Sequence, residues 1–262
     1  MLRVLLLLGV LTASAITLIS VADEIKLGRE AQKQVRASTP QVGGATATLV
    51  ASIGRQLAAK AGGPKYPYAF SVANYRDLNA FALPGGPVWI NRGVLQAART
   101  EAQVAGVLAH EIAHIARRHA AQQISKGVIA NGLLGLLGAV LGNTGGARTA
   151  QTGAQILAGG SMMKFSRDDE READRVGADI LRRANWDPRG MLEFMQILRE
   201  RAGRDPGSVE VFLSSHPSPA ERVEHLRAQV AAVKAAGRRD SAAFQRVRTA
   251  LAKMPAAPRM PR

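Results

Sequence analysis

Hydrophobic residues recur at helical spacing over most of this chain. Before residue 62, apolar positions three and four apart predict two amphipathic helices, with breaks at Ser38–Pro40 and Gly43–Gly44. The same spacing returns after residue 99 and predicts further helices at residues 100–125, 148–164, 166–183, 188–202 and 219–237. We therefore expect a mainly helical protein.

Between these helical parts, short apolar runs are typical of β-strands. They lie at residues 68–72, 79–83 and 88–91, and the turn residues Pro84–Pro87 separate the second run from the third. We predict that the three strands form a small antiparallel sheet next to the helix that begins near Thr100. The predicted fold class is α+β, mainly helical.

The helix near Thr100 has a clear predicted start. Thr100 and Gln103 have the spacing of a capping box, in which each side chain binds the other residue's backbone N–H. Apolar residues at helical spacing extend the helix to about Ser125. They are Val104, Val107, Leu108, Ile112 and Ile115.

The stretch Gly127–Gly142 is apolar and rich in glycine. It allows two interpretations, a hairpin that touches a membrane and a buried or lid-like helical segment. It is shorter than a full membrane span and glycines interrupt it, which favours the second interpretation.

The N-terminus resembles an export signal. Met1–Arg3 is a short positive region, Val4–Ala15 is apolar, and Ser20 and Ala22 are small residues suited to a cleavage site. Ala13 and Ala15 offer a second site. The alternative is an uncleaved anchor, since residues 4–22 are nearly long enough to cross a bilayer. Either way, we expect the body of the protein to be exported.

Composition and charge narrow the function classes. Of the 262 residues, 47% are hydrophobic and only 4% aromatic, which excludes a disordered chain and favours helices. The net charge is +15, but no aromatic residues are interleaved with the basic ones, so nothing supports nucleic-acid binding. The basic residues Lys234–Arg239 begin a Pro-containing tail, either solubilising or in contact with a membrane surface. We thus divide the chain into a signal or anchor (1–22), a main domain (23–230) and a basic tail (231–262).

The chain has no cysteine. This excludes disulfides, a cysteine-ligated metal, a cysteine nucleophile and the lipidation of an N-terminal cysteine.

The candidate chemistry centres on His110-Glu111-Ile112-Ala113-His114. Two histidines four residues apart lie on one face of a helix and can bind one metal ion. Zinc accepts histidine nitrogen and carboxylate oxygen and keeps a position open for water. Glu111 can take a proton from that water and later give it to the leaving amine.

The third zinc ligand must come from further along the chain. The metzincin pattern is excluded, because Arg117 and Ala120 occupy its glycine and histidine positions. No Asp or Glu occurs between His114 and Lys164. In the acidic segment that follows, residues 170 and 174 share a helix face while residue 172 points away. This makes Glu170 the ligand and Asp174 a residue that orients an imidazole.

These motifs resemble the zinc metallopeptidase family of HtpX, the CAAX prenyl proteases and BepA. The resemblance covers about residues 23–227 and rests on four separate motifs in the same order. They are Asn79–Gly86, His110–His114, Ser166–Asp174 and Ser215–Pro217 with Arg222 beyond it.

The resemblance implies a minimal gluzincin-like domain with one Zn²⁺, Glu170 as the third ligand and Asp174 in support. It also implies that the strand at Val88–Asn91 lines the cleft and pairs with an extended substrate. His216 and Arg222 match positions near the metal, and with Glu111 they are the predicted catalytic residues, both acting near the oxyanion. His216 would polarise the oxyanion or, as in BepA-like members, fill the open zinc position and keep the enzyme latent.

The predicted function is a zinc metalloendopeptidase that cleaves unfolded or misassembled envelope proteins. The alternative is a largely latent, zinc-containing factor that binds such clients. The expected location is the periplasm of a Gram-negative bacterium, soluble or tethered. On a continuous helix, His119 lies about half a helical circumference from His110, so we do not expect it to be a ligand. We expect His225 to lie at the surface.

Overall fold

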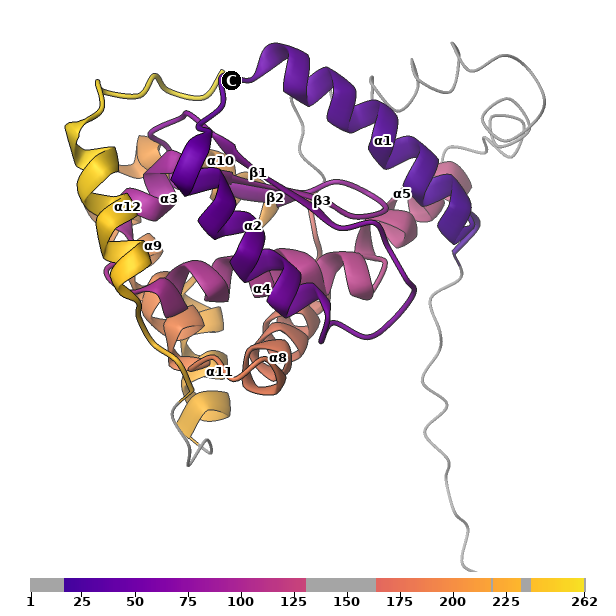
Figure 1. Cartoon of the computed structure of the whole chain (residues 1–262). Coiled ribbons are helices and arrows are strands. Elements are labelled where there is room, and N and C mark those ends of the chain that lie inside the picture. Colours follow the sequence, from indigo (N-terminus) through magenta and orange to yellow (C-terminus); the bar gives the residue numbers. More distant parts are fainter. Residues whose placement is uncertain (1–16, 131–163, 218, 232–236, 262) are drawn as a thin grey trace, which may run out of the picture.

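The structure is a computed structural model that describes residues 17–130, 164–217, 219–231 and 237–261. Helices lie on both sides of a small sheet (Figure 1). The helices are α1 (Val21–Ser38), α2 (Gly44–Ala58), α3 (Arg92–Ala97), α4 (Glu101–Ala116), α5 (His119–Ala130), α8 (Arg167–Arg183), α9 (Arg189–Arg204), α10 (Glu210–Ser215), α11 (Pro219–Ala231) and α12 (Ala242–Lys253), with a 3-10 turn at Pro206–Ser208. The prediction of a mainly helical α+β fold is confirmed.

The sheet is mixed rather than antiparallel. Its strands, β1 (Ala69–Ala73), β2 (Ala80–Ala82) and β3 (Pro87–Asn91), have the order β1-β3-β2. The short turn after β2 makes β2 and β3 antiparallel, but β1 pairs with β3 in parallel. Because β3 is central, both of its edges are occupied. The expectation that Val88–Asn91 pairs with a substrate is therefore wrong.

The two faces of the sheet contact different helices. On one face, Val72, Val88 and Ile90 join the main core together with residues of α2 and α4. On the other face, Trp89 packs with Ala31 of α1 in a smaller cluster. The sheet is thus a middle layer, and α4, which carries the predicted zinc motif, lies in the main core.

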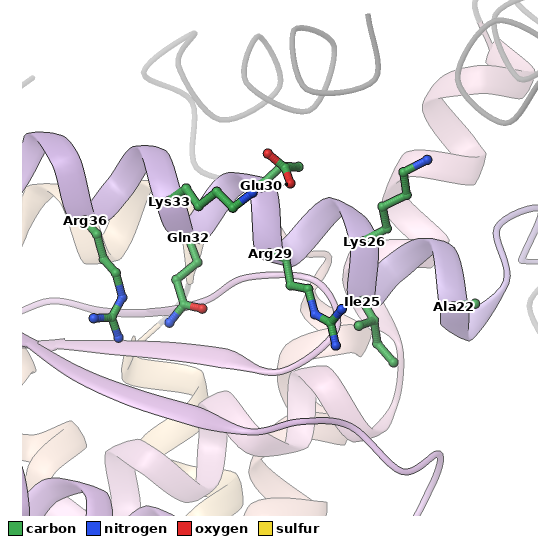
Figure 2. Close-up of a pocket in the computed structure, with 8 residues that line it drawn as sticks. All are labelled: Ala22, Ile25, Lys26, Arg29, Glu30, Gln32, Lys33 and Arg36. Carbon is green, nitrogen blue, oxygen red and sulfur yellow. Dashed lines mark hydrogen bonds and ion pairs between the residues drawn. The ribbon is translucent and has the colours of Figure 1, made fainter. Parts of the chain in front are cut away.

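Helix α1 also holds the sheet through a polar side chain. Arg36 donates a hydrogen bond to Ser71 at 3.2 Å, and its guanidinium lies 6.0 Å from the centre of the Trp89 ring. Figure 2 shows the hollow along α1 that Arg36 lines, where Lys33 reaches Glu30 at 2.8 Å. This hollow is distant in sequence from the predicted zinc residues, and none of them lines it.

Helix α4 is buried at every one of its residues and contacts α8 and α9 along its length. Small residues allow this close packing. A Cβ added to Gly106 would lie 2.6 Å from the Cα of Met191 in α9. The alanine- and glycine-rich sequence of α4 therefore reflects contact on all sides.

The predicted helix 100–125 is divided into α4 and α5. Between them, Arg118 has a positive φ of 61°, which is uncommon for any residue except glycine. Its guanidinium donates to Glu24 Oε1 and to the backbone oxygen of Ile19, both at 2.6 Å. These contacts stabilise the break between α4 and α5. No glycine or proline at this point of the sequence indicates it.

The predicted capping box at Thr100 is also wrong. The Thr100 side chain makes no cap hydrogen bond, and Gln103 Oε1 instead accepts from the backbone N–H of Arg99 at 2.7 Å. A real capping box does occur at the start of α8, where Ser166 and Asp169 bind each other's backbone N–H.

The predicted basic tail is largely folded. Helix α12 buries Phe244, Val247 and Leu251 in the main core. Beyond it, buried Arg92 donates to the backbone oxygens of Met254 and Pro255, at 3.2 and 2.8 Å. Most residues after 237 thus belong to the domain rather than to a solvated extension.

Some predictions fall outside the described residues. They are the apolar segment Val4–Ala15, most of Gly127–Gly142 and the helix at 148–164. Within the described part of the chain, no helix has the length and hydropathy needed to cross a membrane.

Candidate metal centre

The two histidines of the zinc motif face each other on α4. Their Nε2 atoms lie 3.0 Å apart, and their rings meet edge to face with centroids 4.6 Å apart. Both side chains are buried. The spacing of four residues on one helix produces this arrangement directly.

Helix α8 brings a carboxylate to this pair. Its first turn is fixed by the capping box, and Glu170 follows with one oxygen 3.5 Å from His110 Nε2 and the other 3.4 Å from His114 Nε2. Glu170 is 1% exposed, so its charge is not solvated.

A third imidazole completes the cluster. His216 follows α10, and its Nδ1 lies 2.9 Å from Glu170 Oε1 and 3.4 Å from His110 Nε2. The four donor atoms of His110, His114, Glu170 and His216 all lie within 4.8 Å of one another.

This donor set fits a zinc ion. Ligands bonded to one tetrahedral zinc at about 2.0–2.1 Å lie about 3.3 Å from each other. The observed separations between donor atoms, 3.0, 3.5, 3.4, 2.9 and 3.4 Å, lie on either side of that value. Nitrogen and carboxylate donors are also the types that zinc accepts.

The surroundings of Glu111 also fit a metal ion that binds a water molecule. Glu111 is 1% exposed, and in the described residues neither of its carboxylate oxygens has a hydrogen-bond partner. His216 lies beside it, with Nε2 3.7 Å from Glu111 Oε1. A buried carboxylate without a donor is costly, and a water molecule held at the cluster would supply one.

Arg222 and Asp174 form the support of the cluster. Arg222 of α11 donates to Asp174 through Nε at 2.8 Å, and its Nη1 forms an ion pair with Glu170 Oε2 at 2.6 Å. Asp174 Oδ1 in turn lies 3.0 Å from His110 Nδ1. The structure thus brings together all the site residues that the sequence predicts: His110, Glu111, His114, Glu170, Asp174, His216 and Arg222.

These contacts shift the pKa values of the buried groups. Burial raises the pKa of Glu170, but the charges of His216 and Arg222 outweigh it and hold the pKa well below its usual value. Asp174 behaves in the same way next to Arg222. Burial lowers the pKa of His110, yet hydrogen bonds to Asp174 and Glu170 raise it overall to about 9. Burial dominates at His114 and lowers its pKa.

Two neighbours of the cluster were not anticipated. Phe165 packs against His114 with ring centroids 4.0 Å apart, and His119 Nδ1 lies 2.9 Å from His114 Nδ1. As expected, His119 is not among the grouped donor atoms. It nevertheless contacts His114, one of the residues that supply them. The sequence gives no sign of the helix break at Arg118, and without that break His119 could not be predicted to lie next to His114. His225 is exposed, as predicted.

Comparison with known proteins gives consistent matches. The model of peptidase family M48 matches residues 45–230. The chain is 31% identical over 220 residues to the Beta-barrel assembly-enhancing protease of Escherichia coli K12, covering 82% of this chain and 45% of that protein. It is 36% identical over 151 residues to the mitochondrial metalloendopeptidase OMA1 of Saccharomyces cerevisiae, covering 56% of this chain and 42% of that one.

A third relative, the metalloprotease YcaL of Escherichia coli K12, is 28% identical over 168 residues, covering 64% of each chain. The chain spans about half the length of the first of these relatives, 45% of it.

Proposed function

The chain belongs to peptidase family M48, and from this premise we propose that it is a zinc-dependent endopeptidase. In this proposal His110, His114 and Glu170 bind one zinc ion, and Glu111 is the general acid and base. The observation that carries it is the group of donor atoms at zinc-like separations beside the buried carboxylate of Glu111, which has no hydrogen-bond partner in the part of the chain that the structure describes.

Zinc held there would acidify a water molecule so that it attacks a peptide carbonyl. Glu111 would accept the proton of that water and pass it to the leaving amine. Its neighbours suit this task, because no donor among the described residues lies within hydrogen-bond distance of its oxygens. Asp174 and Arg222 would orient His110 and Glu170 rather than contact the substrate, since both are engaged with these two residues.

His216 has two candidate roles, to polarise the oxyanion or to fill the open zinc position. Its Nδ1 belongs to the donor group, at 2.9 Å from Glu170 Oε1, and its ring stacks on Phe212 with centroids 4.7 Å apart. This geometry supports the second role. We therefore propose that the described arrangement is a latent state, and that His216 must leave before a substrate binds.

The proposed substrates are unfolded or misassembled proteins of the cell envelope, and the proposed location is the periplasm. The similarity to a Beta-barrel assembly-enhancing protease supports both. An extended substrate would pair with β2, because β2 is an edge strand and contacts α4. The alternative, a client-binding factor that rarely cuts, is favoured by the burial of the whole donor group.

The decisive experiment compares cleavage of an unfolded protein by zinc-loaded wild type, Glu111→Gln, His216→Ala and the double variant. We expect Glu111→Gln to bind one zinc and to lose about 10²–10⁴-fold in rate in either background. If wild type and His216→Ala both bind zinc but neither cuts, the endopeptidase proposal fails and the client-binding alternative stands.

A further inference from the structure

His114 has a second partner on the side away from the cluster. Its Nε2 faces His110 and Glu170, whereas its Nδ1 lies 2.9 Å from Nδ1 of His119. The His119 ring is 1% exposed and meets the His114 ring edge to face, with centroids 4.9 Å apart.

His119 is held in turn by a carboxylate. Its Nε2 lies 3.1 Å from Oε2 of Glu172, the residue of α8 that points away from Glu170 and Asp174. Arg117 Nη2 lies 2.6 Å from the other oxygen of Glu172. The helix break at Arg118 makes this chain possible, because a continuous helix would turn residue 119 away from residue 114.

The positions of the hydrogens follow from this chain of contacts. If His114 Nε2 offers a lone pair to a metal, its proton is on Nδ1 and is donated to His119 Nδ1. His119 must then carry its own proton on Nε2, where Glu172 accepts it. Each atom has one role, and the order from cluster to surface is His114, His119, Glu172.

We propose that His119 and Glu172 are positioning residues that fix the tautomer and orientation of His114 for zinc binding. Asp174 contacts Nδ1 of His110 directly, whereas Glu172 acts on His114 through the imidazole of His119, which lies between them. Such outer partners typically contribute about 10–100-fold to metal affinity. The inference rests on the proposed zinc site.

The test is zinc affinity, measured by competition with a chelator, together with the ¹⁵N shifts of His114 in metal-free protein. His119→Phe keeps the ring but accepts no hydrogen bond, and we expect it to weaken zinc binding about 10–100-fold. His119→Gln has an acceptor and a donor, and should recover most of the loss. Glu172→Gln still accepts from His119, and we expect a loss of less than about tenfold.

The matched control is Asp179→Asn, a carboxylate-to-amide change on the same helix, where Asp179 pairs only with Arg182 and Arg183 among the described contacts. It should leave zinc affinity unchanged. Wild type should show His114 protonated on Nδ1, and His119→Phe should show a mixture of tautomers.

Two results would overturn the proposal in different ways. If wild type binds zinc and His119→Phe binds it equally well with the same His114 tautomer, the positioning role is wrong while the proposed function stands. If wild type binds no zinc at one equivalent, the metal site itself fails, and the positioning role fails with it.

Discussion

Arg222 and Asp174 form a two-point ion pair in the protein interior, with the arginine Nε and Nη2 at 2.8 and 2.6 Å from the two carboxylate oxygens. The same guanidinium reaches Glu170. With Glu111 there are three buried acidic side chains around one buried arginine. A divalent cation bound beside them would add positive charge to this acidic cluster.

Replacing Arg222 with methionine should therefore destabilise the metal-free protein strongly. The change leaves two buried carboxylates without their cation, and breaking a buried pair in this way costs about 3–5 kcal/mol. Urea denaturation measures the loss. Arg171→Met is the control, because Arg171 also joins α8 to α11, through Glu221, but is 44% exposed. It should cost much less than Arg222→Met, because solvent screens an exposed ion pair. Equal effects of the two variants would mean that Arg222 is not compensating buried charge.

His216→Ala should raise the rate at which the zinc-loaded protein cleaves an unfolded substrate. The side chain lies in the donor group and would compete with water for the metal, so its removal opens that position. Folding should be little affected, and one equivalent of zinc should still bind through the remaining three residues. Steady-state cleavage and zinc titration check both points. A fall in rate of about 10²-fold with zinc retained would instead indicate an oxyanion role.

Alanine substitutions at two helical glycines should change stability in opposite directions, one through close packing and the other through helix propensity. Gly106→Ala in α4 should destabilise the protein by about 1–3 kcal/mol, since its Cβ would lie 2.6 Å from backbone of α9. Gly203→Ala in α9 meets nothing within 4 Å and should stabilise by about 0.5–1 kcal/mol, because alanine favours a helix. Thermal denaturation of both variants gives the comparison. Stabilisation of both would show that α4 and α9 can separate at little cost.

The sequence predicts the site better than it predicts the sheet, for a physical reason. His110, His114, Glu170 and Asp174 are placed by the period of two helices, which is a local property. The pairing of β1 with β3 depends on which strand lies between them, and local pattern does not encode that. The split of α4 from α5 depends on Glu24 and Ile19, about a hundred residues before Arg118. For the same reason, the neighbour His119 could not be found from spacing alone.

The structure also bears on where a leader could be removed. Ser20 and Ala22, the small residues of the predicted cleavage site, lie at the N-cap and in the first turn of α1. Cleavage after Ala22 would remove the capping box with Asp23 and the Ile19 oxygen that Arg118 binds. We expect any cleavage to occur before Thr17, whose hydroxyl also accepts from Arg118 at 3.2 Å. N-terminal sequencing of the protein recovered from cells checks this, and a start at Asp23 would contradict it.

Asp187 should make the stability of the protein depend on pH in acid. It is fully buried and accepts from the Arg189 side chain at 2.9 Å, from Arg239 at 2.5 Å and from the Arg189 backbone N–H at 3.0 Å. Burial raises its pKa, but these hydrogen bonds outweigh burial and lower the pKa below the value in the unfolded chain. The folded state therefore binds the proton less readily than the unfolded state. Its stabilising contribution is complete above the unfolded pKa of about 3.9, and is lost as pH falls through the lower folded pKa.

Asp187→Asn should accordingly cost about 1–3 kcal/mol at pH 7, the usual range for a lost hydrogen bond to a charged group. The difference from wild type should stay constant down to about pH 5 and shrink below about pH 4, where Asp187 of the unfolded wild-type chain begins to bind a proton while the folded carboxylate is still ionised. Urea denaturation at several pH values measures it, with Asp168→Asn as the control, since Asp168 is 90% exposed. A difference that grows as pH falls would mean that the folded protein holds the proton on Asp187 more tightly than the unfolded chain does. Arg189 and Arg239 would then not be its dominant partners.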